Sequence, residues 1–351
     1  MKRHVVGLMI VVTASCSAFQ SFASSAQDIT IQGKTFYKEG KPWVPKGIKV
    51  EGLNEPAGLR VKSKVATEAR NNWNAKERDA IKQVFGADTI RFAVSQPGLD
   101  PQSPIYDPAY LDELLAAFKE AREAGFVIIP SMDAQGENGI EGLPCMPNDS
   151  TLRTWKKLAP PLASDPGVMF ELFDEPCKTM KPEDKAEWTT DTQAVLNAVR
   201  ATGAKNILLI DGLHYARSTS GLFPLIHDTI PNRMALAVHP YLSKGWFVNE
   251  KQWQREFGAE ASKYPTIASE WNATPTSGCI GPDTPSVAGS LMRYLESLHI
   301  GLIGWAIDSN YGKLVKDHTN FQSTDYSAFM DCSKTPSDSG GGKLLANYPN
   351  N

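Results

Sequence analysis

The feature that most constrains this chain is a pair of segments that recurs along it, a short apolar run followed by an amphipathic stretch. The apolar runs are Val44–Val50, Thr89–Val94, Phe126–Met132, Val168–Phe173, Asn206–Ile210, Met234–Val238, Thr266–Ala268 and Gly301–Ile307. Most are continuous rather than alternating, which is typical of parallel strands covered by helices outside and packed against a core inside. The recurrence therefore predicts eight such strands.

The segments between the runs carry the start and stop signals of helices. Asp107 reads as an N-cap, Pro108 as the first helical residue and Gly125 as the end of that helix. The pair Thr284-Pro285 opens another segment whose apolar residues recur at helical spacing. Eight strands that alternate with helices predict an α/β fold, the (β/α)8 TIM barrel.

The segment before the first apolar run, residues 29–41, has Gly33 and Gly40 at turn positions. We interpret it as a short N-terminal β-hairpin that covers the lower end of the barrel. Catalytic residues of such barrels lie at the opposite end, just after the strands.

The first 26 residues are typical of a signal peptide. A basic start, Met1-Lys2-Arg3, is followed by the apolar run Val5–Val12 and by small residues. The apolar run is too short to span a bilayer, and no later stretch is apolar enough to do so. We therefore expect a secreted or periplasmic protein, with lipid attachment through Cys16 as the less favoured alternative.

Removal of this segment leaves residues 27–351, which we interpret as a single barrel domain. Lys2 and Arg3 leave with the segment and no acid does, so the net charge of −3 becomes −5. A mildly acidic protein has no electrostatic reason to bind nucleic acid. The length suits one barrel of about 250 residues with long loops. Nothing in the sequence indicates an oligomeric state.

Four cysteines follow the signal peptide, and an even number in an exported chain indicates two disulfides. The sequence allows three pairings of Cys145, Cys177, Cys279 and Cys332. The barrel prediction favours Cys145–Cys177 and Cys279–Cys332, because each pair would join loops on the same face. The cysteine spacings do not fit a zinc site.

Two glutamates stand where the fourth and seventh predicted strands end. Glu175 lies in Phe173-Asp174-Glu175-Pro176, and Glu270 lies in Ser269-Glu270-Trp271. Hydrolysis of a glycosidic bond with retention needs two carboxyl groups about 5 to 5.5 Å apart, one protonated and one ionised. Two neighbouring carboxylates resist ionising together, which supports that division. The ordinary alternative is a pair of rim acids in salt bridges.

Other strand ends carry side chains suited to the same chemistry. Arg91, in the second strand, is placed to hold Glu270 ionised. His239 and Tyr241 follow the sixth strand, where a histidine can bond a sugar hydroxyl and a tyrosine can orient the nucleophile. Trp305, in the eighth strand, offers a flat ring for the apolar face of a sugar.

Together these segments resemble glycoside hydrolase family 5, the cellulase and mannanase family of clan A, over roughly residues 41–311. The resemblance rests on Thr89-Ile90-Arg91-Phe92, Glu171-Leu172-Phe173-Asp174-Glu175-Pro176, His239-Pro240-Tyr241, Ile267-Ala268-Ser269-Glu270 and Trp305. It implies that Glu175 is the acid/base and Glu270 the nucleophile. It further implies that Arg91 and Tyr241 support the nucleophile, that His239 lies in the site, and that Trp305 floors a sugar subsite.

The chain departs from the family pattern at two places, which indicates an outlying branch. The residue before the acid/base is usually Asn, whose amide donates to the sugar 2-hydroxyl. Here it is Asp174, which must either accept that bond or carry a proton. The family commonly has His after the third strand, where this chain offers Asp133 and Gln135 as possible sugar ligands.

The sequence therefore predicts a retaining β-glycosidase, and the resemblance favours an endo-β-1,4-glucanase that needs no metal or organic cofactor. A β-mannanase or another β-glycan hydrolase is the nearest alternative. A second alternative is a non-catalytic glycan-binding protein on the same barrel, which the unusual Asp174 leaves open. A metal-dependent hydrolase is disfavoured, because only His214 and His239 lie near the relevant strand ends.

Overall fold

The computed structural model describes residues 28–60, 69–70, 72–133, 144–242, 247–273, 284–309, 314–325 and 339–349. Within these ranges, eight parallel strands close into a barrel in the order β10-β11-β4-β5-β6-β7-β8-β9. They are β4 (Lys46–Val50), β5 (Thr89–Ala93), β6 (Val127–Ser131), β7 (Met169–Glu171), β8 (Ile207–Asp211), β9 (Met234–Val238), β10 (Thr266–Trp271) and β11 (Gly301–Gly304). Each overlaps one of the eight predicted runs, so the predicted (β/α)8 barrel is confirmed.

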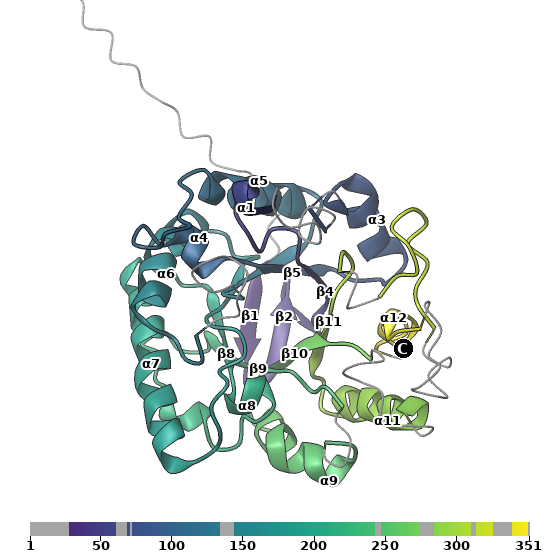
Figure 1. Cartoon of the computed structure of the whole chain (residues 1–351). Helices are drawn as coiled ribbons and strands as arrows, with labels where there is room; N and C mark the ends of the chain where they lie inside the picture. The colour runs from purple at the N-terminus through teal and green to yellow at the C-terminus, as the bar shows by residue number, and fades with distance from the viewer. Residues whose placement is uncertain are drawn as a thin grey trace, which may run out of the picture.

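Helices surround the strands on all sides (Figure 1). They are α1 (Ala57–Arg60), α3 (Ala75–Gln83), α4 (Gln96–Leu99), α5 (Tyr110–Glu123), α6 (Asp149–Leu162), α7 (Pro182–Ala201), α8 (Leu213–Ala216), α9 (Glu250–Trp253), α10 (Ala259–Ala261), α11 (Thr284–Ser297) and α12 (Gly342–Ala346). Two buried indoles tie this outer layer to the upper strand ends. Trp155 of α6 donates to the Leu172 carbonyl at 2.8 Å, and Trp188 of α7 donates to the Asp211 carbonyl at 3.1 Å.

The start of α5 differs from the prediction by two residues. Asp107 still accepts from the backbone N–H of Ala109 at 2.9 Å, the bond expected of an N-cap to the second residue after it, but the turn it closes is not yet regular α-helix. The helix then begins at Tyr110. The predicted end is correct, since Gly125 follows with a φ of +85°.

The predicted N-terminal hairpin is part of a three-stranded antiparallel sheet, β1 (Ile29–Gln32), β2 (Thr35–Lys38) and β3 (Lys41–Trp43). Gly33 and Gly40 take positive φ values at its two turns. The sheet covers the lower end of the barrel, and in Figure 1 β1 and β2 lie behind the opening enclosed by the strands.

An apolar cluster joins this sheet to the barrel interior. The sheet contributes Ile29, Ile31 and Phe36, and the barrel contributes Val127, Ile129, Met169, Ile207, Leu209, Ala235, Ala237, Ile267 and Ile303. Hydrogen bonds to the backbone of Ile29 fix the sheet in place. The N–H of Ile29 donates to the Pro166 carbonyl at 3.2 Å, and Arg233 donates to the Ile29 carbonyl at 3.0 Å. The lower end is therefore sealed by packing.

Cys145 and Cys177 form one of the two predicted disulfides, with their Cα atoms 4.9 Å apart. Cys279 and Cys332 lie outside the described residues, as do the predicted signal peptide and Cys16. Among the described helices, none combines the length and the apolar composition needed to cross a membrane.

Candidate active site

The upper end of the barrel gathers the polar side chains that the strands carry at their carboxyl ends. All seven predicted site residues lie there: Glu175, Glu270, Arg91, Asp174, His239, Tyr241 and Trp305. They come from strands β5, β10 and the segments that follow β7, β9 and β11. The contacts below join them into one network.

Glu270 is held by three donors among the described residues. Its Oε2 atom accepts from Lys49 Nζ at 2.6 Å and from Arg91 Nη1 at 2.7 Å. Its Oε1 atom accepts from the Tyr241 hydroxyl at 2.9 Å. Burial alone would raise the pKa of Glu270, but the cations Lys49, His239 and Arg91 outweigh burial and hold that pKa well below its usual range. Glu270 is therefore a fixed, ionised carboxylate.

β10 is irregular where it carries this residue. Its pairing with β11 shifts register between Ala268 and Trp271. Such irregularities re-aim side chains and recur beside active sites. The shift places Ser269 and Glu270 together in the site, so that both contact the segment that follows β9.

Arg91 is fully buried and connects both halves of the site. Its guanidinium donates to Glu171, to Asp174, to Glu270 and, at 2.9 Å, to the Ser131 hydroxyl. A planar guanidinium with several fixed donors suits such a junction. Arg91 therefore sets the position of the carboxylates around it.

Glu175 stands in a different environment from Glu270. Its side chain is 32% exposed, against 10% for Glu270. Its Oε1 atom lies 2.9 Å from His239 Nδ1, and its backbone N–H donates to Asp211 Oδ2 at 3.0 Å. Its φ of +49° lies in the left-handed region, which a residue other than glycine adopts only when its surroundings hold it there.

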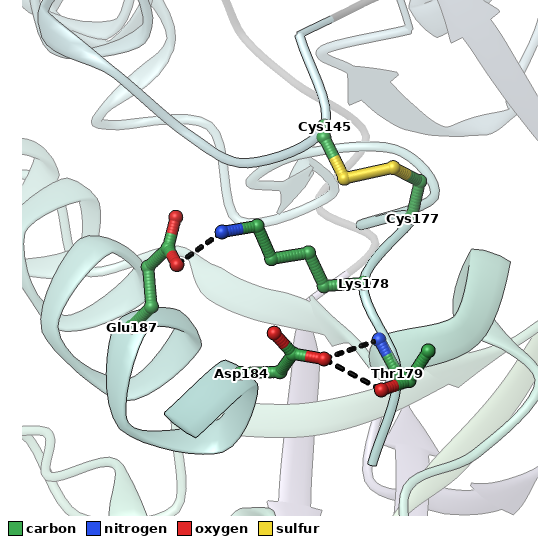
Figure 2. Close-up of a disulfide and its surroundings, with 6 residues drawn as sticks. All are labelled: Cys145, Cys177, Lys178, Thr179, Asp184 and Glu187. Atoms are coloured by element: carbon green, nitrogen blue, oxygen red, sulfur yellow. Dashed lines mark hydrogen bonds and ion pairs between the residues drawn. A yellow bond between two sulfur atoms is a disulfide. The ribbon is translucent and has the colours of Figure 1, made fainter. Parts of the chain in front are cut away.

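The segment after Glu175 is clamped from two directions. The disulfide joins Cys177 to Cys145, and the Cys177 N–H donates to the Cys145 carbonyl at 3.0 Å. Figure 2 shows the next two residues bonded to α7, Lys178 to Glu187 and Thr179 to Asp184. These contacts fix the chain that leaves the site.

His239 is fully buried between the two glutamates. Its Nδ1 atom faces Glu175, and its Nε2 atom lies 3.1 Å from the hydroxyl of Ser269, the neighbour of Glu270. Burial lowers the pKa of His239, but the hydrogen bond to Glu175 and the nearby charge of Glu270 raise it above the ordinary value. His239 therefore links the two acids, contacting Glu175 through one ring nitrogen and the neighbour of Glu270 through the other.

Asp174 accepts from Arg91 through Oδ1, and its other oxygen has no hydrogen-bond partner among the described residues. Burial and the neighbouring Asp133 raise the pKa of Asp174 well above its usual range, although Arg91 and Lys49 oppose them. A protonated Asp174 resembles asparagine, because one oxygen accepts while the other group donates.

Trp305 lies at the edge of the site and is partly exposed. Its indole N–H donates to Glu51 Oε1 at 2.6 Å, and its ring meets Tyr241 edge to face at a centroid distance of 6.4 Å. The bond to Glu51 and the contact with Tyr241 orient the indole. Its remaining face is available to an apolar sugar surface.

Several site residues were missed by sequence reasoning: Lys49, Glu51, Glu171 and Asp211. Of the two proposed third-strand ligands, Asp133 is in the site beside Lys49, and Gln135 lies outside the described residues. A signal for Lys49 and Glu171 existed, because both interrupt apolar strands near their carboxyl ends, and a charge in such a strand is rarely buried without a partner.

Two groups of residues have metal-ligand chemistry: Glu171 with Asp211 and His239, and Asp174 with His239 and Glu270. Ligand atoms within each group lie within 4.8 Å of one another. A cation there would compete with Arg91 and Lys49, which already neutralise these carboxylates. The arrangement fits acid–base chemistry better than metal binding.

A closed (β/α)8 barrel with two unlike carboxyl groups and an aromatic ring at its upper end defines a glycoside hydrolase. Residues 57–311 match the family model for cellulase, glycosyl hydrolase family 5. The chain belongs to this family, and it is a retaining glycoside hydrolase of β-glycans. A search of curated proteins finds no match.

Solved structures of glucanases share the fold. A β-glucanase from Saccharophagus degradans superposes with a TM-score of 0.67 at 20% identity, over 87% of this chain and 92% of that one, and has also been solved with cellotetraose. The catalytic domain of Thermobifida fusca endoglucanase Cel5A gives 0.62 at 14% identity, over 91% and 96%. The alkaline cellulase K catalytic domain gives 0.63 at 15% identity, over 93% of each chain.

Proposed function

We propose that the protein is an endo-β-1,4-glucanase in which Glu270 is the nucleophile and Glu175 the general acid/base. The unequal environments of the two carboxyl groups carry this proposal. Three donors hold Glu270 as an anion, while Glu175 is the more exposed and contacts His239. A retaining glycosidase needs two unlike carboxyl groups, one ionised to attack the sugar and one that can give and take a proton.

In the first step, Glu270 attacks the anomeric carbon as the bond to the leaving oxygen breaks. Glu175 gives its proton to that oxygen, and an ester forms between Glu270 and the sugar. In the second step, Glu175 takes a proton from water while the water oxygen bonds to the anomeric carbon. The ester bond breaks, and its electron pair returns to Glu270.

The remaining residues act on the substrate or on these two acids. Arg91 and Tyr241 orient Glu270 through the bonds to its two oxygens. Asp174 donates to the sugar bound at Glu270, because carboxylate oxygens of Asp174 and Glu270 lie within 4.8 Å of each other. Trp305 stacks on a sugar ring. A glucan substrate is supported by family membership and by the β-glucanase and endoglucanase structures that share the fold.

Product analysis on a panel of β-glucans, mannans and xylans tests this proposal. We expect cello-oligosaccharides of several lengths from a β-1,4-glucan, and proton NMR should show the β-anomer first. A first product of α configuration would overturn the retaining mechanism. Preferred cleavage of mannan would reassign the substrate, and binding without any product would identify a glycan-binding protein.

We also propose that the protein is exported with residues 1–26 removed. The composition of that segment and the disulfide Cys145–Cys177 support this, because disulfides persist in oxidising compartments. N-terminal sequencing of protein recovered from the periplasm or medium tests it. An intact Met1 on the recovered protein would contradict removal of the segment.

A further inference from the structure

We propose that Lys49 is a catalytic residue that acts in the second half of the reaction, where it stabilises Glu270 as the departing carboxylate. The inference rests on the proposed role of Glu270. It assigns a task to a residue that sequence reasoning did not place in the site.

Lys49 is the fourth residue of β4, and its side chain is only 4% exposed. In the register between β4 and β5, Lys49 pairs with Arg91. Paired residues of neighbouring strands point to the same side of the sheet. Two cations thus stand side by side on the barrel interior, and both contact Oε2 of Glu270.

Burying a lysine is unfavourable unless carboxylates surround it, and placing it beside an arginine adds repulsion. Lys49 meets this requirement with three acids. Its ammonium group contacts Glu270 at 2.6 Å, Glu51 at 3.1 Å and Asp133. Arg91 and Tyr241 already hold Glu270. A second cation on the same oxygen therefore does more than fix the orientation of the carboxylate.

The charge on Glu270 changes twice during the reaction. It disappears when the ester forms and returns when the ester breaks. Lys49 keeps Glu51 and Asp133 as counter-charges while Glu270 is neutral, so its ammonium group need not move or be resolvated. A cation that is already in place stabilises the charge that develops on Glu270 as it leaves, without reorganisation in that step.

The same contact has an opposite effect on the first step. A carboxylate that is strongly stabilised as an anion is a weaker nucleophile and a better leaving group. Lys49 therefore slows formation of the glycosyl-enzyme and speeds its breakdown. Its removal should make breakdown rate-limiting, so that the covalent intermediate accumulates.

The test compares the wild-type enzyme with Lys49→Met, using 2,4-dinitrophenyl β-cellobioside, whose leaving group departs without a proton. We expect kcat to fall about 10- to 100-fold, the range for losing one hydrogen bond between charged groups. The KM should fall by at least a similar factor, so kcat/KM stays the same or rises. A burst of dinitrophenol close to one equivalent should appear, with a cellobiosyl adduct in the intact-protein mass spectrum.

Two further variants serve as controls. Lys38→Met removes a lysine that pairs with Asp88 at the lower end of the barrel, and it should leave kcat, KM and the burst unchanged. Lys49→Gln is neutral but still donates a hydrogen bond. It should show the same burst with a smaller fall in kcat, and it replaces the methionine variant if that variant fails to fold.

A fall in kcat/KM equal to the fall in kcat, without a burst or adduct, would overturn the role of Lys49 in the second step. That result is distinct from failure of the proposed function, in which the wild-type enzyme itself would release no sugar product from any glycan.

Discussion

The two ends of the barrel are built from the same strands but are stabilised by different interactions, apolar packing at one end and ion pairs at the other. At the lower end, β1 to β3 seal an apolar cluster that includes Ile29 and Phe36. At the upper end, buried cations and carboxylates form a continuous network around Arg91. β7 shows the change within one strand, since Met169 packs into the lower cluster and Glu171, two residues on, bonds Arg91. Substitutions at the lower end should therefore change stability, and those at the upper end should change activity.

The largest effect that this comparison predicts is the loss of activity in Glu270→Ala. We expect kcat to fall about 10⁴-fold or more, because no covalent intermediate can form. The midpoint of thermal unfolding should stay near that of the wild type. Steady-state hydrolysis and thermal melting measure the two quantities. Glu123→Ala, on the exposed face of α5, is the control with unchanged rates. If Glu270→Ala kept a tenth of the wild-type activity, Glu270 would not be the nucleophile.

Phe36→Ala probes the opposite end. Phe36 is buried against the barrel and meets Trp43 edge to face. Its truncation should lower the free energy of unfolding by about 3 to 5 kcal/mol. Urea unfolding measures this loss. The kcat per folded molecule should not change, and burst titration of active sites gives the enzyme concentration needed to calculate it. Tyr37→Ala, one residue on and only half-buried, should destabilise less. A loss of kcat in Phe36→Ala would show that the two ends are coupled.

The disulfide offers an intermediate case, because it stabilises the chain and also lies beside Glu175. Replacing Cys145 and Cys177 by serine opens a loop with a sequence separation of 32 residues. The free energy of unfolding should fall by about 3 to 4 kcal/mol. The activity should fall as well, because Glu175 loses part of its support. Dithiothreitol should have this effect on the wild type but a much weaker one on the double variant. Equal activity of the two proteins would limit the disulfide to a structural role.

The smallest effect concerns Asp174→Asn and the pH dependence of activity. Because its pKa is raised, Asp174 keeps its proton to a higher pH than an ordinary aspartate, and it loses its donor as the pH rises through that value. Asparagine never loses its donor. With a dinitrophenyl substrate, kcat/KM of the wild type should fall on the alkaline side. The variant should keep about 10-fold more activity there and differ little at the lower pH values, where Asp174 is protonated. Asp107→Asn, in the turn before α5, is the control. Superimposable profiles of the wild type and Asp174→Asn would contradict donation by Asp174.

Sequence reasoning recovered the barrel because eight strands that are buried on both faces leave an unambiguous pattern of apolar runs. It also placed seven site residues at one end, because parallel strands share a carboxyl-terminal edge. It missed β3, since Lys41–Trp43 is short, contains a proline and joins the sheet only through pairing with β2.

The missed site residues share a physical cause. Lys49, Glu171 and Asp211 are charged groups whose partners lie on other strands, far away in the sequence. Lys49 and Glu270, for example, are separated by 221 residues. Their role depends on register and closure of the barrel, which a run of apolar residues does not encode. Asp174 itself was visible in the sequence, but the causes of its raised pKa were not, because they are its burial and the approach of Asp133 from the segment after another strand, β6.

The sheet at the lower end has a consequence for how the chain reaches its native state. The Ile29 carbonyl accepts a hydrogen bond from Arg233, 204 residues later in the chain. The segment around Ile29 is therefore synthesised early but cannot dock until most of the barrel has been made. Contacts of such long range slow folding. Until then Ile29, Ile31 and Phe36 remain open to water and to other nascent chains. We therefore expect docking of the sheet to be a late event in folding. Before it docks, the partly folded chain should be more prone to aggregation than the native protein.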